Sequence, residues 1–462
     1  MQNVAHTWIA SSEFRTENEL ASRFIDINDK KLRYVIEWNK WLVWDGKRWQ
    51  IDAGETYVVR LARAFSNLLW EDFGIVARME LTRDELSQIR TFCKIANKDN
   101  GIRAFLNLAR ADERISVRVD ELNSKPNLLN LQNGTFDLDI GELLPHSQQD
   151  LLTQIANVAF DAEANAVRWE AAITTIFAGD IDLIRYVRQL LGYSITGDSG
   201  EHILPIAYGN GFNGKSMVWN TILRLLGDYA SLANDTLLIG NQNSHPTEKA
   251  FLYQKRFVPI SEPEQSAKLK ESRVKELTGD GTITARRVHE DFWSFNRTHT
   301  FWLSTNHLPR ITGNDNGIWR RVKLIPFLVD LRNVTTPIPD LDKILVDEEG
   351  PGILNWLLAG WKDYRKEQGF IEPECVKAAT GDYRREEDEL ATFFADCCVI
   401  GAQYMVSASN LFDAYTTWGG KQNRTVFGKA VTERFDKRKH VAGEFRKKTM
   451  YDGIGLASDD NF

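Results

Sequence analysis

The segment that most constrains this fold runs Gly209-Asn210-Gly211-Phe212-Asn213-Gly214-Lys215-Ser216. It fits the pattern G-x-x-x-x-G-K-[ST], with an additional glycine at position 211. The glycines allow consecutive backbone N–H groups to turn inward around an anion, because no Cβ atoms clash there. In this pattern Lys215 supplies a positive charge to the β- and γ-phosphates, and Ser216 supplies a hydroxyl group to Mg²⁺. We therefore expect a backbone loop that binds the phosphates of a nucleoside triphosphate.

The residues on both sides of this loop predict the strand and the helix that such a loop requires. An apolar run, 203–208, precedes it, and 217–226 follows with helical spacing before Gly227 ends the helix. This order places bound phosphates at a helix N-terminus, which favours anions. Pro205 lacks the N–H that a central strand needs, so we expect it at the first residue of the strand. Residues 202–330 continue to alternate short apolar strands with helices, which predicts an α/β unit.

The rest of the chain shows helical and strand patterns in separate blocks. Residues 35–51 predict a short antiparallel meander, because Asp45-Gly46 is a strong hairpin signal between runs rich in Trp, Val and Ile. Its tryptophans (Trp38, Trp41, Trp44, Trp49) suit either base stacking or the core of a small sheet, and we expect the core. Other blocks predict helices over 57–110 and 166–195, strands over 129–145, and a mostly helical region after 372 that ends in a strand over 451–457.

Composition excludes a membrane span and a disulfide framework. No stretch approaches about 18 uncharged apolar residues, and the N-terminus lacks the basic and apolar regions of a signal peptide. The cysteines show no zinc spacing, since Cys397 and Cys398 are adjacent and Cys93 and Cys375 are isolated. These features predict a reduced, cytoplasmic protein with no membrane partner.

Charge is distributed unevenly along the chain. The net charge is −7, yet residues 421–450 contain ten Lys/Arg and three Asp/Glu. A solvated helical face is one interpretation of such a run, and a nucleic-acid surface is the other. The negative net charge does not exclude nucleic acid, because a local basic patch in a ring channel is sufficient.

Polar residues follow the phosphate loop at the ends of further apolar runs. Glu262 and Glu264 end one run, and an acid at the tip of the strand beside the loop strand can hold Mg²⁺ and polarise the attacking water. Asn306 ends a second run, where its amide can orient water against the γ-phosphate. Arg320 and Arg321 precede a third apolar run. An arginine that one subunit supplies to the γ-phosphate bound by a neighbouring subunit raises the rate of hydrolysis about 10³–10⁵-fold. Each signal is weak alone, so it is their order after the loop that indicates an ATPase.

In this order the motifs resemble those of the superfamily 3 helicases, specifically the C-terminal helicase half of phage and plasmid primases and of the poxvirus primase-helicase. The resemblance covers nearly the whole chain. Its blocks are RFIDINDKKLRYVIEWNKWLVWDGKRW, NLLNLQNGTFDLDIGELLPHS, LIRYVRQLLGYSITG, KELTGDGTITARRV, FWLSTNHLP and GIWRRVKLIPF, with Asp382-Tyr383-Arg384 and LFDAYTTWGG in the closing region. The resemblance implies a P-loop AAA+ ATPase core, an N-terminal α+β region, a helical collar and a C-terminal winged-helix-like domain.

Changes in pattern set the domain boundaries, since no Pro/Gly/Ser-rich linker separates the parts. We expect an N-terminal α+β domain over 1–120, a partly helical collar over 121–195, the ATPase core over 196–335, a helical connection over 336–385 and the winged-helix-like domain over 386–462.

The resemblance also assigns roles to individual residues. Lys215 and Ser216 match the Walker A pair, Glu262 matches the Walker B acid with Glu264 as a second acid, and Asn306 matches a polar sensor. Arg321 or Arg320 matches the arginine finger, with Arg321 favoured. The implied ligands are residues 209–216 for the nucleotide and Ser216, Glu262 and Glu264 for Mg²⁺. The implied DNA contacts are Lys275, Arg286, Arg287 and His289, around a turn expected at 278–281 in a hairpin that lines the channel of a ring.

Together these features imply an ATP-dependent replicative DNA helicase of phage, prophage or plasmid type, in the cytoplasm of a bacterial host. The expected cofactors are ATP and Mg²⁺, and the expected partners are single-stranded DNA, forked duplex and further copies in a homo-hexamer. A separate primase is a further expected partner, because the residues before the phosphate loop match the collar and carry no paired-acid primase motif. The alternatives are an ATP-switched origin-binding or loader protein without unwinding activity and a P-loop kinase of a small metabolite.

Overall fold

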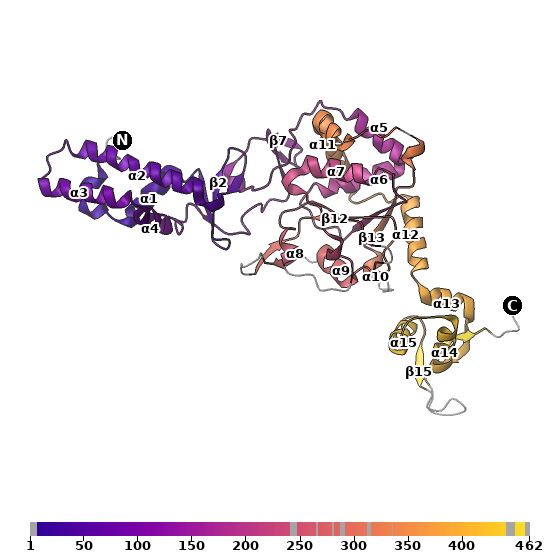
Figure 1. The fold of residues 1–462 in the computed structure, drawn as a ribbon. Helices are drawn as coiled ribbons and strands as arrows, with labels where there is room; N and C mark the ends of the chain where they lie inside the picture. The colour runs from indigo at the N-terminus through magenta and orange to yellow at the C-terminus, as the bar shows by residue number, and fades with distance from the viewer. Residues whose placement is uncertain are drawn as a thin grey trace.

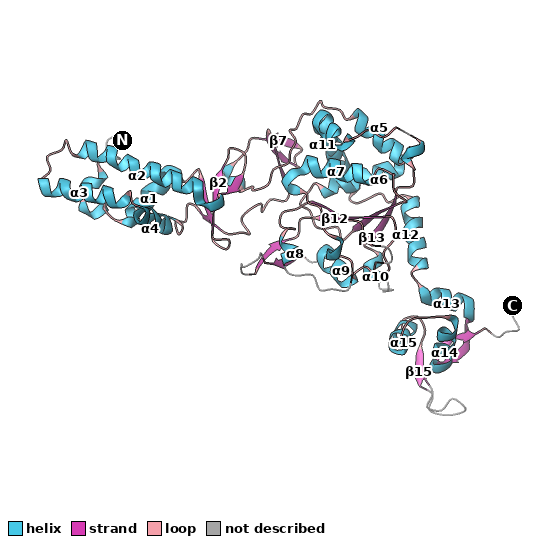
Figure 2. Cartoon of the chain, viewed as in Figure 1, coloured by secondary structure: helices cyan, strands magenta, loops and turns pink. Residues whose placement is uncertain are grey.

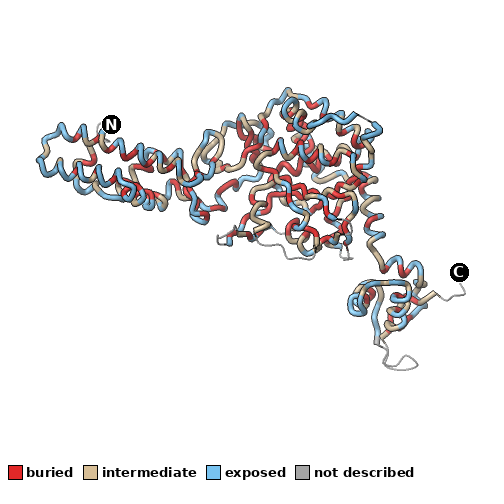
Figure 3. Tube along the Cα trace, in the orientation of Figure 1, coloured by how far each residue is buried: buried red, intermediate tan, exposed pale blue. Residues whose placement is uncertain are grey.

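The computed structural model describes residues 7–240, 247–264, 267–279, 281–286, 292–311, 316–334, 336–439 and 449–457. These residues form a helical N-terminal part, a central α/β part, and a small C-terminal part that helix α12 (Glu374–Glu386) joins to the centre (Figure 1). Helices and strands occur in each part (Figure 2), and buried residues concentrate in the centre (Figure 3). Within these described residues, no helix is both long enough and apolar enough to cross a bilayer.

The N-terminal part packs helices against a small sheet. Its helices are α1 (Glu17–Asn28), α2 (Thr56–Val76), α3 (Arg83–Ala96) and α4 (Asp99–Ala109). Its strands are β1 (Leu32–Val35), β2 (Lys40–Trp44), β3 (Trp49–Ile51) and β4 (Ser116–Val117), in the order β3-β2-β1-β4. The antiparallel pairs of β2 with β1 and β3 confirm the expected meander, and α2 to α4 confirm the helices expected over 57–110.

The tryptophans of the meander are mainly core residues, as expected. Trp41 and Trp49 are fully buried, Trp38 is nearly so, and Trp44 is half-buried. Trp38 lies edge-to-face against Tyr253 and Trp293 of the central part, with ring centroids 5.4 and 6.1 Å away. The buried rings therefore join two parts of the molecule and are not exposed for stacking on bases.

A small sheet and two helices precede the central sheet. The strands are β5 (Leu128–Leu131), β6 (Gly134–Asp137) and β7 (Glu142–Leu144), and the helices are α5 (Val167–Ile176) and α6 (Ile181–Ser194). They confirm the strands expected over 129–145 and the helices expected over 166–195. Helix α6 packs closely on α11 (Leu341–Glu367), because a Cβ atom on Gly360 would lie 2.0 Å from the carbonyl oxygen of Arg188.

The central part is built on a parallel sheet, which confirms the expected α/β class. Its strands are β8 (Leu204–Tyr208), β9 (Phe257–Ile260), β12 (Thr300–Thr305) and β13 (Val322–Pro326), in the order β13-β8-β12-β9. Helix α7 (Lys215–Leu226), with α6 and α11, covers one face, and α9 (Glu271–Gly279) and α10 (Asn316–Trp319) cover the other (Figure 1). Leu204 and Ile206 enter the core on the α9 side, whereas Ala207 enters the core on the α7 side. Both faces are buried, as a parallel sheet requires.

The strand order corrects one expectation. β9, which ends just before Glu262, is not beside the loop strand β8, because β12 lies between them. The strand between β8 and β9 is β12, which ends directly before Asn306. Buried parallel strands share the same apolar pattern, so their sequences carry no signal for their lateral order.

The prolines of the sheet lie where a missing N–H is tolerated. Pro205 is the second residue of β8 and not the first, but β12 pairs with β8 only from Ile206 onward. Pro259 lies in β9, at the edge of the sheet. β8 and β9 therefore form as predicted despite their prolines.

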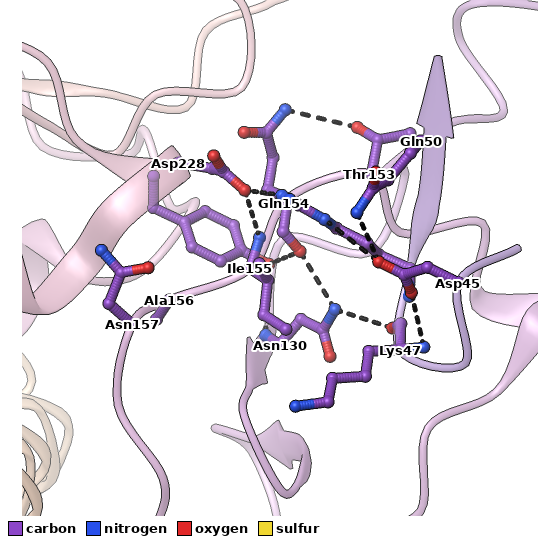
Figure 4. A network of polar contacts seen from close by, with 12 residues as sticks. Asp45, Lys47, Gln50, Asn130, Thr153, Gln154, Ile155, Ala156, Asn157 and Asp228 are labelled. Carbon is purple, nitrogen blue, oxygen red and sulfur yellow. Dashed lines mark hydrogen bonds and ion pairs between the residues drawn. The ribbon is translucent and has the colours of Figure 1, made fainter. Parts of the chain in front are cut away.

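A buried polar network joins the N-terminal hairpin to the far end of α7 (Figure 4). The side-chain amide of Asn130, which is fully buried, donates to the carbonyl oxygens of Lys47 and Gln154, both at 3.0 Å. Arg48 forms an ion pair with Asp228, which directly follows α7 and its capping glycine. Since α7 begins at the phosphate loop, this network fixes the opposite end of the helix that carries the loop.

The C-terminal part has its own core. It contains α13 (Glu389–Cys397), β14 (Cys398–Ser407), α14 (Ala408–Trp418), α15 (Arg424–Thr432), β15 (Lys437–Lys439) and β16 (Thr449–Leu456), with the strands in the order β14-β16-β15. β16 confirms the expected terminal strand, whereas β14 was not anticipated in a region expected to be mostly helical. Asp382-Tyr383-Arg384, assigned to the closing region, instead lies on α12, where Tyr383 packs on Trp319 of the central part.

The ring of His299 is enclosed directly before β12. It is 1% exposed and lies against Phe301, with ring centroids 4.4 Å apart. Burial, together with the smaller effect of the nearby charge of Arg297, lowers the pKa of His299 to about 3. His299 is therefore neutral in the folded protein, whereas a histidine in an unfolded chain binds a proton near pH 6.5.

We expect this histidine to destabilise the fold as the pH falls. Below about pH 6.5 the unfolded state binds a proton that the folded state does not, so the free energy of unfolding falls by about 1.4 kcal/mol per pH unit. Thermal unfolding between about pH 7.5 and pH 5 should therefore show a steeper loss of Tm for the wild type than for His299→Gln. The comparison is between the slopes of Tm against pH, so a loss of Tm that the substitution causes equally at every pH does not affect it. Equal slopes would contradict a neutral His299.

Candidate nucleotide-binding site

The glycine loop at 209–214 leads from β8 into α7, which confirms the expected order of strand, loop and helix. Gly209 and Gly214 have φ angles of 153° and 87°, which side-chain-bearing residues rarely adopt. A Cβ atom on Gly209 would lie 2.0 Å from the carbonyl oxygen of Phe327, and one on Gly214 would lie 2.5 Å from Cδ1 of Ile176. Both positions therefore require glycine for conformation and for space.

The segment that follows β13 holds the loop from one side. The side-chain amide of Asn213 donates to the carbonyl oxygen of Phe327 at 2.9 Å, and the backbone N–H of Leu331 donates to the carbonyl oxygen of Phe212 at 2.9 Å. The ring of Phe212 is 67% exposed, and the Arg332 guanidinium lies 4.6 Å from its centroid. The loop is thus anchored at its base, while Phe212 stands at its outer edge.

Lys215 links the loop to the polar residues at the ends of β12 and β9. Its Nζ donates to the carbonyl oxygen of Gly209 at 2.7 Å and to Oδ1 of Asn306 at 3.2 Å. The backbone N–H of Asn306 in turn donates to Oε1 of Glu262 at 2.8 Å. Burial lowers the pKa of Lys215 below its usual range, and the nearby carboxylate of Glu262 partly offsets this. The structure therefore brings together Lys215, Asn306 and Glu262, which lie far apart in the sequence.

Residues suited to Mg²⁺ lie at the same edge. Ser216, in the first turn of α7, and Glu262 and Glu264 are all exposed. Among the described residues, no cluster of three or more His, Cys, Asp or Glu side chains could hold a metal by itself. A magnesium ion that arrives with a triphosphate is held by one or two protein groups together with phosphates and water, so a hydroxyl and a carboxylate fit that donor set.

A cavity of about 560 Å³ adjoins the loop. It is lined by Phe212 and Gly214 of the loop, by the face of α5 that carries Ile176, and by Leu331 and Ile338 after β13. Its walls are mainly apolar, which suits a flat ring better than a charged group. No local sequence pattern predicts these walls, because α5 and residues 331–342 meet the loop only in the folded chain.

The two arginines after α10 have different surroundings. Arg321 is 6% exposed, and its guanidinium donates to Oγ1 of Thr278 at 3.1 Å and to the carbonyl oxygen of Gly317 at 2.5 Å. Arg320 is exposed. Helices α10 and α7 lie on opposite faces of the sheet (Figure 1), so neither arginine belongs to the cluster around Lys215. The geometry favours Arg320, and not Arg321, as a side chain that can reach another molecule.

The expected hairpin is present, but residues 278 and 279 do not form a turn of it. Strands β10 (Thr282–Ala285) and β11 (Trp293–Asn296) pair antiparallel, whereas Thr278 and Gly279 end helix α9 and form no turn. Val274, Leu277 and Thr278 form the buried face of that helix. The prediction of a turn relied on the sequence Thr278-Gly279 and missed this helical spacing. Lys275 therefore lies on α9, and Arg286 follows β10 with its guanidinium 5.2 Å from the ring centroid of Phe292. Arg287 and His289 lie outside the described residues.

Two families match this chain. The family described as "D5 N terminal like" matches residues 21–178, and a family of unknown function (DUF5906) matches residues 207–321, from the end of β8 to Arg321. The second match therefore contains the phosphate loop, Glu262, Asn306 and both arginines.

Curated relatives come from large DNA viruses. An Acanthamoeba polyphaga mimivirus protein provisionally named a helicase is 27% identical over 293 residues, which are 59% of this chain and 30% of that protein. An African swine fever virus protein provisionally named a primase is 23% identical over 325 residues, 65% of this chain and 34% of that protein. The chain spans about a third of the length of these relatives.

A solved structure shares the fold over most of its length. The apo structure of the C-terminal region of NrS-1 covers 95% of this chain and 99% of its own, with a TM-score of 0.52 and 12% sequence identity. At this identity the likeness concerns the fold alone.

Proposed function

The chain belongs to the primase-helicase family of phages and DNA viruses, and from this premise we propose that it is an ATP-dependent helicase of DNA replication. The observation that carries the proposal is the contact of Lys215 with Asn306, and of Asn306 with Glu262, beside a glycine loop at the start of a helix. These are the groups that phosphoryl transfer from a triphosphate to water requires.

ATP fits the loop and the cavity together. The backbone N–H groups of 209–216 and the N-terminus of α7 bind the phosphates, and the adjoining apolar cavity receives the base. Mg²⁺ bound with the triphosphate would neutralise charge on its phosphates, and Ser216 and Glu262, with Glu264 nearby, would hold it. In the proposed reaction Lys215 leaves the carbonyl oxygen of Gly209 for the γ-phosphate, Glu262 accepts a proton from the attacking water, and Asn306 orients that water.

A ring of identical subunits would complete the site. Arg320 is exposed and directly follows α10, which lies on the sheet face opposite α7, so we expect it to act not on its own subunit's nucleotide but on a neighbour's in a head-to-tail assembly. We propose a homo-hexamer of the AAA+, superfamily 3 type. We propose that its hairpin β10–β11, with Arg286 after β10 and with Arg287 and His289 of the sequence between the two strands, contacts single-stranded DNA in the channel. Mass measurement with nucleotide and single-stranded DNA checks the ring size.

The activity is tested by ATPase and unwinding assays on the purified chain. We expect ATP hydrolysis to increase when single-stranded DNA is added, and a forked duplex to be separated in the presence of ATP and Mg²⁺. Hydrolysis without strand separation would support instead a loader or origin-binding protein. Hydrolysis that is insensitive to DNA but depends on a small acceptor molecule would support a metabolite kinase. A separate primase as partner is a further proposal, tested by co-purification from infected or lysogenic cells.

A further inference from the structure

Helix α12 places one of its faces on the central part of the molecule (Figure 1). The residues of this face are spaced by three, one and three positions, as a helical stripe requires: Thr380, Tyr383, Arg384 and the C-cap residue Glu387. Oγ1 of Thr380 accepts a hydrogen bond from the backbone N–H of Leu324 in β13 at 3.0 Å. Oε2 of Glu387 accepts one from the backbone N–H of Ile311, in the segment after β12, at 2.8 Å. The helix is therefore fixed to two neighbouring regions of the central part.

Helix α10 carries Arg320 at its end. The helix has four residues, Asn316–Trp319, and Arg320 follows it directly. A helix of one turn is not stable by itself, so its position depends on the contacts of its side chains. The backbone N–H of Arg320 donates to the carbonyl oxygen of Asn316 at 3.1 Å. A displacement of Asn316 therefore displaces the backbone of Arg320 with it.

Contacts from two sides hold this short helix. On the side of α9, the buried guanidinium of Arg321 anchors it. On the side of α12, the guanidinium of Arg384 donates to Oδ1 of Asn316 at 2.6 Å and lies 6.0 Å from the ring centroid of Trp319. The ring of Tyr383 lies edge-to-face against Trp319, with centroids 5.3 Å apart. Arg384 thus contacts both the first and the last residue of α10.

We propose that Arg384 is a positioning residue for Arg320: it holds α10 so that the Arg320 side chain is directed to the nucleotide of the neighbouring subunit. The inference rests on the proposed function, in which Arg320 acts between subunits. A charged group that stabilises a transition state depends on its placement, and an error of about 1 Å can cost about 10²-fold in rate. Since Arg320 is exposed, its placement depends on the backbone of α10, which Arg384 holds from α12.

The contact between Arg384 and Asn316 lies at the surface, since both residues are exposed. A contact of this kind contributes little to stability, so its loss should leave the fold intact. The next residue offers a contrast, because Arg385 pairs with Asp382 within α12. Two adjacent, exposed arginines of one helix therefore differ in their partners, and only the contact of Arg384 with α10 leads to Arg320.

The test compares Arg384→Ala with Arg385→Ala in the full chain. We expect Arg384→Ala to lower kcat for ATP hydrolysis about 10- to 10²-fold, while KM for ATP and the Tm stay at their wild-type values. Asn316→Ala should reproduce this loss, and Arg384→Lys, which keeps a cationic donor, should retain part of the activity. Arg385→Ala is the matched control, because it removes the same charge from the same helix without a contact to α10, and its kcat should equal that of the wild type.

A double variant tests whether Arg384 acts through Arg320. If it does, Arg320→Ala/Arg384→Ala should release radiolabelled phosphate from ATP at the same rate as Arg320→Ala alone. A further loss in the double variant, equal to the loss that Arg384→Ala causes by itself, would show that Arg384 acts independently and would overturn the proposal.

Two other results would also overturn it: a wild-type kcat for Arg384→Ala, or an equal loss in the Arg385→Ala control. These results can be told apart from a failure of the proposed function. If the wild type does not hydrolyse ATP, or if Arg320→Ala keeps wild-type activity, then it is the proposed action of Arg320 that fails, and this inference fails with it. If Arg320→Ala is inactive while Arg384→Ala is not, only the inference about Arg384 fails.

Discussion

Replacing Lys215 by alanine is expected to lower kcat for ATP hydrolysis by about 10²-fold or more. The substitution removes the cation that lies at the loop and contacts Asn306, and a single positioned group of this kind is worth about 10²–10³ in rate. The fold should remain intact, because a buried charge with a lowered pKa contributes little net stability. Steady-state ATPase with and without single-stranded DNA measures the loss.

Lys362→Ala is the matched control for this experiment. Lys362 is an exposed lysine on α11, so its loss removes the same side chain and charge far from the loop. We expect its ATPase and its Tm to equal those of the wild type. A Lys215→Ala protein with wild-type turnover would contradict the assignment of the loop, provided that thermal unfolding shows both variants folded.

Replacing Arg320 by alanine is expected to lower ATP hydrolysis by about 10³-fold while nucleotide binding remains. The reason is that Arg320 is exposed and follows α10, on the sheet face opposite α7, so it would act on the transition state in a neighbouring subunit and not on the nucleotide of its own. This variant should therefore bind a fluorescent ATP analogue with wild-type affinity while its turnover of ATP is lost. Arg78→Ala, which removes an exposed arginine from the N-terminal part, is the control.

Arg321→Ala should behave differently from Arg320→Ala. Arg321 is buried and donates to Thr278 and Gly317, so its loss should lower the Tm, by hydrogen bonds worth about 1.5–3 kcal/mol each, whereas Arg320→Ala should not change the Tm. Mixing the Lys215→Ala and Arg320→Ala proteins gives interfaces in which an intact loop meets an intact arginine, and we expect part of the activity to return. No recovery in mixed assemblies would exclude an arginine that acts between subunits.

Local sequence patterns were sufficient to predict the strand, the loop and the helix that form the candidate site. The glycine run between an apolar strand and a helical block predicted β8, the loop and α7, because glycine spacing and hydrophobic period are local properties. Asp45-Gly46 and its flanking tryptophans likewise predicted the meander and its core. The turn expected at 278–281 was wrong, because the buried packing of Val274 and Leu277 keeps Thr278 and Gly279 in a helix.

The sequence by itself determined the glycine loop between β8 and α7 and the residues that form it, since those residues are consecutive and their backbone requirements are local. Only the tertiary structure decided the lateral order of the strands, the contact of Lys215 with Asn306, the apolar wall beside the loop and the burial of Arg321 next to an exposed Arg320. These features depend on contacts between segments tens of residues apart. Adjacent arginines in the sequence R-R are chemically equal, and only packing against α9 distinguishes them.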